Sequence, residues 1–118
     1  KNCKINPQAI IFGPVLIGDN CTLEANSSVI GPTVIGNNCF LGSGSRLEAS
    51  VLDSNCHLET SAVVKQSILA QNSYVGHKTH IEEVAVLGKN VKVGANNWLK
   101  RGIKIWPDTT IPDETVKF

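Results

Sequence analysis

The stretch VLIGDNCTLEANSSVIGPTVIGNNCFLGSGSRLEASVL, residues 15–52, decides the fold. In it a branched aliphatic residue returns at every sixth position from Ile17 to Leu47 and once more, after five, at Leu52. Six is not a multiple of 3.6, so these residues would wander around an α-helix instead of forming one stripe. The glycine, proline and asparagine residues between them would also break a helix repeatedly. The period therefore indicates short strands separated by turns.

The series continues over nearly the whole chain, with a second step of five between Val64 and Leu69. Taken in threes, its members form three columns: Ile5, Leu23, Leu41, Leu58, Val75, Val93 and Ile111; Ile11, Val29, Leu47, Val64, Ile81 and Leu99; and Ile17, Ile35, Leu52, Leu69, Leu87 and Ile105. Both shortened steps fall at the same corner of successive coils. A short turn is then stacked on a short turn, which keeps the strands in register.

The residue two before each aliphatic is usually small, and the exceptions are Val15, Val91, Asn97 and Ile103. Because side chains alternate along a strand, the small residue and the aliphatic point to one side and the residue between them to the other. Closed coils of three hexads, spaced about 4.8 Å apart and joined by backbone hydrogen bonds, would place the small residue and the aliphatic residue on the inside. The sequence thus predicts an all-β fold. It is a single-stranded parallel β-helix of hexapeptide repeats with about six triangular coils, in one domain of residues 1–118.

Two further sets of residues mark the corners. Asparagine and aspartate adopt φ > 0 more readily than other non-glycine residues. They recur at one corner, at Asn2, Asn20, Asn38, Asn55, Asn72, Asn90 and Asp108. We expect a left-handed backbone there, and side-chain amides that hydrogen-bond along the axis. Glycine follows a column aliphatic at Gly18, Gly36, Gly42, Gly76, Gly88 and Gly94. These glycines are predicted to mark turns in the same way.

Composition narrows the function classes. The 11 basic and 10 acidic side chains leave a net charge of +1, so no net field draws the chain toward nucleic acid or an anionic membrane. No apolar run approaches the roughly 18 residues of a spanning helix, and no charged-then-apolar leader opens the chain. We expect a cytoplasmic protein with no nucleic-acid or membrane partner. Methionine is absent, even at position 1, which indicates that these residues belong to a longer polypeptide.

The cysteines form one inward column, one coil apart, at Cys3, Cys21, Cys39 and Cys56. We interpret them as small buried residues, because zinc-type CxxC pairs are missing and stacked neighbours on parallel strands rarely offer disulfide geometry. A reducing cytoplasm fits unpaired cysteines. His57 and His80 fall on different faces and His77 in a turn. They would not converge as zinc ligands must, so we expect solvated histidines and no metal site.

Basic residues concentrate in the later coils but spread over turns and two faces, at Lys89, Lys92, Lys100, Arg101 and Lys104. We interpret them as a solvated surface, with phosphate contact as the alternative. Trp98 and Trp106 flank the final turns. We expect them to cover the open end of the core or to meet a neighbouring domain.

The most informative outward feature is a stripe of aliphatic residues at the centre of the strands that lead into the third column. It consists of Leu16, Val34, Val51, Ile68 and Val86, and Lys104 ends it. The outward positions of the other two faces mix polar, charged, aromatic and aliphatic residues. Soluble monomers seldom leave such a patch bare. We therefore predict that the stripe is a contact surface, for self-association or for packing against another domain.

With residues 15–52 and its ending NWLKRGIKIWPDTTIPDETV, residues 97–116, the chain resembles the C-terminal left-handed β-helix of sugar-1-phosphate nucleotidyltransferases. The resemblance is especially to the mannose-1-phosphate guanylyltransferase-like and glucose-1-phosphate nucleotidyltransferase-like proteins. The segment GIKIWP, Gly102 to Pro107, is more specific than the hexads, which acyltransferases and carbonic anhydrases share. Left-handed coils follow from the resemblance alone, since general crossover rules favour the right-handed form.

In such enzymes catalysis belongs to an N-terminal α/β domain with a Gly-rich nucleotide loop and Mg²⁺, and nothing in this chain matches that loop. The resemblance implies a non-catalytic structural, oligomerisation or regulatory domain of a sugar-nucleotide pyrophosphorylase. The parent enzyme would convert a nucleoside triphosphate and a sugar 1-phosphate to a nucleotide sugar and diphosphate. The domain itself would have no catalytic residue, cofactor or metal. Its partners would be its own catalytic domain, another copy of itself, or both.

Two enzyme classes remain as alternatives: a hexapeptide-repeat acyltransferase and, less favoured, a γ-type carbonic anhydrase. Acyl transfer needs a general base, usually histidine, and usually a protruding loop beside a cofactor groove. The regular hexads from Ile5 to Ile111 leave no room for such an insertion. A carbonic anhydrase needs histidines that converge on zinc, which the predicted layout does not supply.

Overall fold

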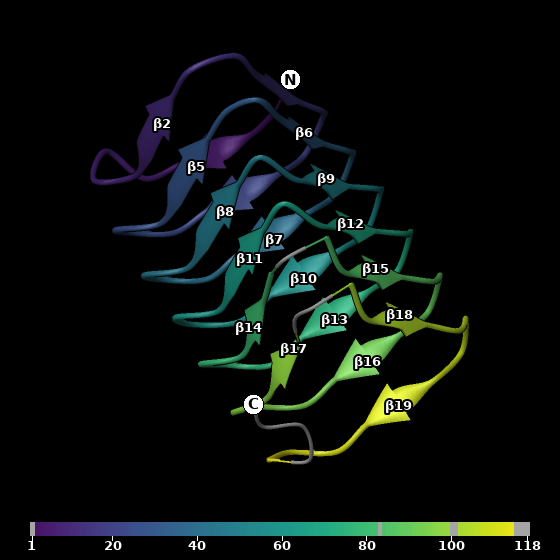
Figure 1. The fold of residues 1–118 in the computed structure, drawn as a ribbon. Coiled ribbons are helices and arrows are strands. Elements are labelled where there is room, and N and C mark those ends of the chain that lie inside the picture. Colours follow the sequence, from purple (N-terminus) through teal and green to yellow (C-terminus); the bar gives the residue numbers. More distant parts are fainter. Residues whose placement is uncertain (1, 83, 100–101, 115–118) are drawn as a thin grey trace.

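The structure, a computed structural model, describes residues 2–82, 84–99 and 102–114. Within these ranges it contains short β-strands and no helix, and no segment that could cross a membrane as a helix. All strand pairs are parallel, and the strands stack into a solenoid of about six turns. Figure 1 shows the coils lying one above another, with β2 and β19 at opposite ends. The predicted β-helix of triangular coils is thus confirmed.

Three sheets form the three faces of the solenoid. Sheet A contains β1 (Lys4–Ile5), β4 (Thr22–Leu23), β7 (Phe40–Leu41), β10 (His57–Leu58), β13 (Tyr74–Val75), β16 (Lys92–Val93) and β19 (Thr110–Ile111). Sheet B contains β2 (Ile10–Phe12), β5 (Ser28–Ile30), β8 (Arg46–Glu48), β11 (Val63–Lys65), β14 (His80–Ile81) and β17 (Trp98–Leu99). Sheet C contains β3 (Val15–Ile17), β6 (Thr33–Ile35), β9 (Val51–Leu52), β12 (Ile68–Leu69), β15 (Val86–Leu87) and β18 (Lys104–Ile105).

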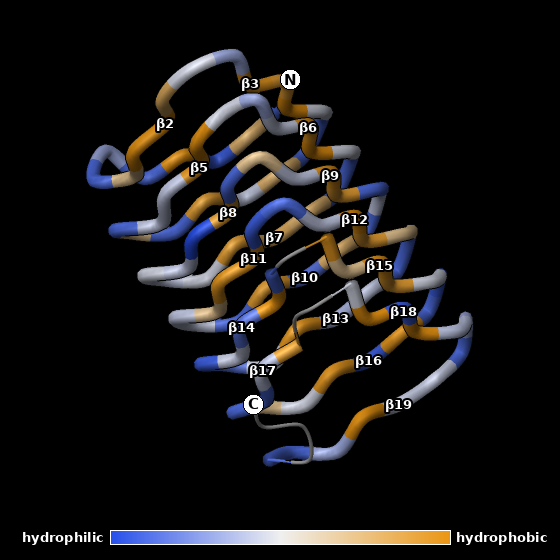
Figure 2. The backbone as a smooth tube through the Cα atoms, in the orientation of Figure 1, coloured by the Kyte–Doolittle hydropathy of each residue, from blue (hydrophilic) through white to orange (hydrophobic). Residues whose placement is uncertain are grey.

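The strand register confirms the aliphatic columns. Leu41 pairs with Leu23 on one side and with Leu58 on the other, so the three lie in adjacent layers of one wall. All three are fully buried. In Figure 2 the strands are mostly hydrophobic and many of the corners between them are polar. The column members of the first coil, Ile5 and Ile11, are exposed because another coil covers them on one side only.

The asparagine corner has the left-handed backbone that the sequence predicts. Asn2, Asn20, Asn38, Asn55, Asn72, Asn90 and Asp108 have φ between 58° and 64°. In this conformation the corner N–H points along the axis. Asn38, for example, donates to the carbonyl of Asp19 at 2.8 Å. The predicted side-chain ladder is present at the last step, where Asn90 Nδ2 donates to Asp108 Oδ1 at 2.9 Å.

A second left-handed corner, between sheets A and B, was not recognised in the sequence. It contains Asn26, Gly44, Ser61, Lys78, Asn96 and Glu114, with φ between 53° and 69°. These residues occupy the same place in the hexad as the asparagine column, three positions after an aliphatic. Residue type hides the corner, since serine, lysine and glutamate are not typical of φ > 0. Position in the repeat is the signal that would have found it.

The prediction for the glycines that follow column aliphatics was wrong. Positive φ among the described glycines occurs at Gly13, Gly44 and Gly102, and none of these belongs to that set. The reason for glycine is instead close approach of the next coil. A Cβ at Gly76 would lie 2.5 Å from the backbone of Gly94 and Ala95, closer than carbon atoms pack. The glycines therefore let the corners of successive coils stack directly.

Small inward residues donate hydrogen bonds from inside the corners. Ser27 Oγ donates to the Glu24 carbonyl at 2.8 Å, and Thr79 Oγ1 donates to the Gly94 carbonyl at 2.6 Å. Asn97, an exception to the small-residue pattern, also points inward, and its Nδ2 donates to the carbonyls of Gly94 and Pro112. These buried side chains thus donate to carbonyl oxygens of the turns, whereas Ser45 Oγ is buried with no hydrogen-bond partner among the described residues.

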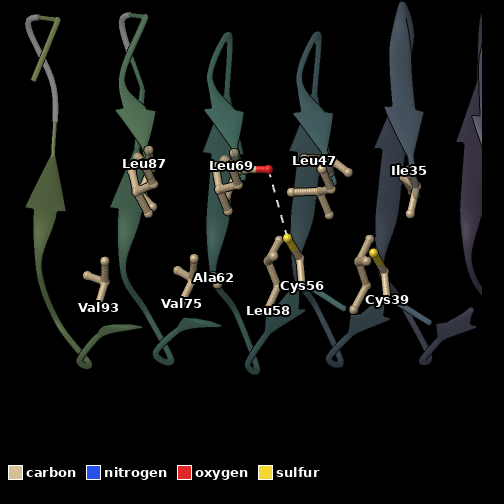
Figure 3. Packing of buried hydrophobic residues seen from close by; sticks show 14 of the residues in the cluster. Ile35, Cys39, Leu47, Cys56, Leu58, Ala62, Leu69, Val75, Leu87 and Val93 are labelled. Carbon is tan, nitrogen blue, oxygen red and sulfur yellow. Dashed lines mark hydrogen bonds between the residues drawn. The ribbon is translucent and has the colours of Figure 1, made fainter. Parts of the chain in front are cut away.

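The cysteine column lies in the core as predicted. Cys21, Cys39 and Cys56 are buried and Cys3 is partly exposed, and no disulfide joins any two of the four. Cys21 Sγ donates to the Gly36 carbonyl at 3.0 Å, and Figure 3 shows Cys39 and Cys56 side by side against the aliphatic columns. A hydrogen bond to Cys56, together with burial, raises the pKa of the Cys39 thiol, and burial raises the pKa of the Cys21 thiol. These thiols are therefore protonated at neutral pH and are poor nucleophiles.

Gly76→Ala is expected to lower the free energy of unfolding by about 1–3 kcal/mol, because the new methyl group must push two hydrogen-bonded coils apart. Asn72→Gly in the same coil is the control. Glycine also adopts the left-handed backbone of that corner, so the change should stay within about 0.5 kcal/mol. Chemical denaturation measures both. Equal stabilities would contradict the close approach of the coils.

In the folded chain, Ellman's reagent is expected to label Cys3 and to leave Cys21, Cys39 and Cys56 unmodified until the chain is unfolded in guanidinium chloride. Absorbance of the released thiol anion gives the count. Cys3→Ser is the matched variant, and it should show no rapid reaction. Rapid labelling in that variant would contradict the buried column.

Candidate contact surface

The predicted stripe forms one straight ladder on the outside of sheet C. Strand register places Leu16 beside Val34, Val34 beside Val51, and Val51 beside Ile68. Val86 and Lys104 continue the ladder in the last two strands. Leu16 is 70% exposed, Ile68 is 50% exposed and Val86 is half-buried. The structure therefore brings all five predicted residues together on one flat face.

A shallow groove runs along one edge of this ladder, at the corner between sheets B and C. Its volume is about 420 Å³, and its lining is Pro14, Val15, Leu16, Pro32, Thr33, Val34, Ala49, Ser50 and Val51. The corner residues Pro14, Pro32 and Ala49 form its outer wall. The sequence analysis did not predict the groove. The available signal was the proline or alanine two positions before each of the first three stripe residues, at Pro14, Pro32 and Ala49.

The same corner carries an apolar side chain further along the axis. Val84 lies two positions before Val86, is 63% exposed and has φ of 63°. A β-branched residue is costly in a left-handed backbone, and a valine that is 63% exposed gains little burial within the described chain. Pro14, Pro32, Ala49, Gln66, Val84 and Gly102 are called the corner column below.

A second hollow of about 320 Å³ lies at the other edge of sheet C, in the last coils. Its lining is Val86, Gly88, Lys104, Ile105, Trp106 and Pro107. Trp106 is 82% exposed, and Trp98 points outward from β17, where its indole N–H donates to Glu82 Oε2 at 3.0 Å. The expectation that the tryptophans cover the open end of the core was therefore wrong. Trp98 lies between two inward residues, and strand alternation turns it out.

Sheet A carries a ladder of rings instead of aliphatic residues. Phe40 and His57 stack with centroids 4.5 Å apart, and His57 and Tyr74 with centroids 5.3 Å apart. Glu59 Oε2 lies 3.0 Å from His57 Nε2 and accepts a hydrogen bond from the Tyr74 hydroxyl at 2.8 Å. Partial burial and that hydrogen bond raise the pKa of Tyr74 to about 12. The rings cover one another, so this face exposes less continuous apolar surface than sheet C.

The histidines lie where the sequence places them. His57 is in β10 of sheet A, His80 is in β14 of sheet B, and His77 is in the turn between β13 and β14. Across residues 2–82, 84–99 and 102–114, no three His, Cys, Asp or Glu side chains come together as metal ligands. The geometry thus gives no support to the carbonic anhydrase alternative, which needs such a cluster.

The basic residues of the later coils do not form one patch where they are described. Lys89 lies in the turn after sheet C, Lys92 Nζ lies 5.5 Å from the centroid of the Tyr74 ring on sheet A, and Lys104 lies on sheet C. Lys100 and Arg101 lie outside the described residues. The predicted spread over several faces holds for the first three.

Comparison with solved structures identifies the fold. The acetyltransferase domain of PglB from Neisseria gonorrhoeae aligns with a TM-score of 0.88 at 18% identity, over 93% of this chain and 54% of that one. AntD, an N-acyltransferase from Bacillus cereus, aligns with a TM-score of 0.83 at 18% identity, over 90% and 73% of the two chains. WeeI from Acinetobacter baumannii aligns with a TM-score of 0.79 at 16% identity, over 84% and 50%. This chain thus spans about half the length of the PglB domain and of WeeI.

At such low identity these likenesses establish the architecture alone, which is a left-handed parallel β-helix. A search of curated protein sequences gave no significant match. The sequence profile of the GMPPB C-terminal domain, in contrast, matches residues 11–117, nearly the whole chain. That match agrees with the resemblance carried by residues 15–52 and 97–116. The chain therefore belongs to the GMPPB C-terminal domain family.

Proposed function

We propose that this chain is a non-catalytic domain that assembles or regulates a sugar-nucleotide pyrophosphorylase. The parent enzyme would convert a nucleoside triphosphate and a sugar 1-phosphate to a nucleotide sugar and diphosphate. The observation that carries the proposal is the family match over residues 11–117, because that family is named for a C-terminal domain. The catalytic machinery would lie in another domain, which also binds Mg²⁺. The solenoid itself would hold no cofactor, and the protein would be cytoplasmic.

The exposed stripe of sheet C supports an assembly role. Leu16, Val34, Val51 and Ile68 are each at least 40% exposed, and they lie in adjacent strands of a rigid sheet. Burial of this apolar surface against a partner is favourable, because it removes apolar area from water. Little side-chain order has to be gained at Val34, Val51 and Ile68, because β-branched residues are already stiff at χ1. The stripe would therefore contact a second copy of the chain or the catalytic domain.

One observation favours acyl transfer as the second candidate. The pair of His57 Nε2 and Glu59 Oε2, 3.0 Å apart, resembles the histidine and orienting carboxylate of a general base. PglB and AntD, which share the fold, are named as an acetyltransferase and an N-acyltransferase. However, His57 is stacked between Phe40 and Tyr74, and neither hollow beside sheet C includes it. The assembly proposal needs no such site.

Val51→Lys and Ile68→Lys are expected to weaken assembly at least tenfold, because an ammonium group buried at an apolar contact loses its hydration. Light scattering and sedimentation measure the mass of the chain and of the full-length protein. Ser28→Lys, at an outward position of sheet B, is the matched control and should leave the mass unchanged. An unchanged mass in both sheet C variants would refute the contact surface.

The chain alone is expected to show no transfer of a nucleotidyl group to a sugar 1-phosphate, measured as diphosphate release. It should also release no free thiol from acetyl coenzyme A in the presence of amino sugars. Diphosphate release by nucleotidyl transfer would overturn the non-catalytic assignment. Thiol release that disappears in His57→Asn would establish the acyltransferase alternative instead.

A further inference from the structure

We draw no further inference here: the strongest candidate, the apolar face of sheet C with the groove and the corner column beside it, belongs to the contact surface already described, and nothing in the described part of the chain shows what covers it.

Discussion

The axial spacing of the backbone hydrogen bonds is the constraint on which the rest of this structure depends. Each coil donates to and accepts from its neighbours, with N to O distances near 2.9 Å, so successive coils cannot move apart. Equivalent residues of neighbouring coils must then stack directly. Leu23, Leu41 and Leu58 fill one wall of the core for this reason, and glycine is needed wherever a corner would place a Cβ against the next coil.

The same constraint explains what the sequence could predict. The columns and the asparagine corner follow from the period of six and from the backbone preference of asparagine, and both are confirmed. The role of the glycines was misjudged, because spacing along the sequence does not reveal whether φ or close approach demands glycine. The groove at Pro14, Pro32 and Ala49 was missed because its shape depends on side chains from three coils, which the sequence keeps 17 or 18 residues apart.

Each face of the solenoid repeats the same outward positions from coil to coil, so a face can acquire a single chemical character along its length. Sheet A carries rings that stack on one another near Glu59. The ring faces contact each other, and the Tyr74 hydroxyl donates a hydrogen bond to Glu59 within the chain. Sheet C carries aliphatic side chains that remain exposed to solvent although they lie side by side. The chain belongs to the GMPPB C-terminal domain family, and under the proposed assembly role a partner would cover the exposed apolar face of sheet C.

The shortened corners at Ala49 and Gln66 have a consequence for how such rods change in evolution. One residue is missing from each, yet Val34, Val51 and Ile68 still pair in register on the far side. A corner therefore tolerates small gains and losses of chain that a strand would not. Loss of one entire coil would likewise shorten the rod by a single layer. Each remaining coil would still pack against coils of the same cross-section. Length in this architecture can be adjusted without redesigning the cross-section.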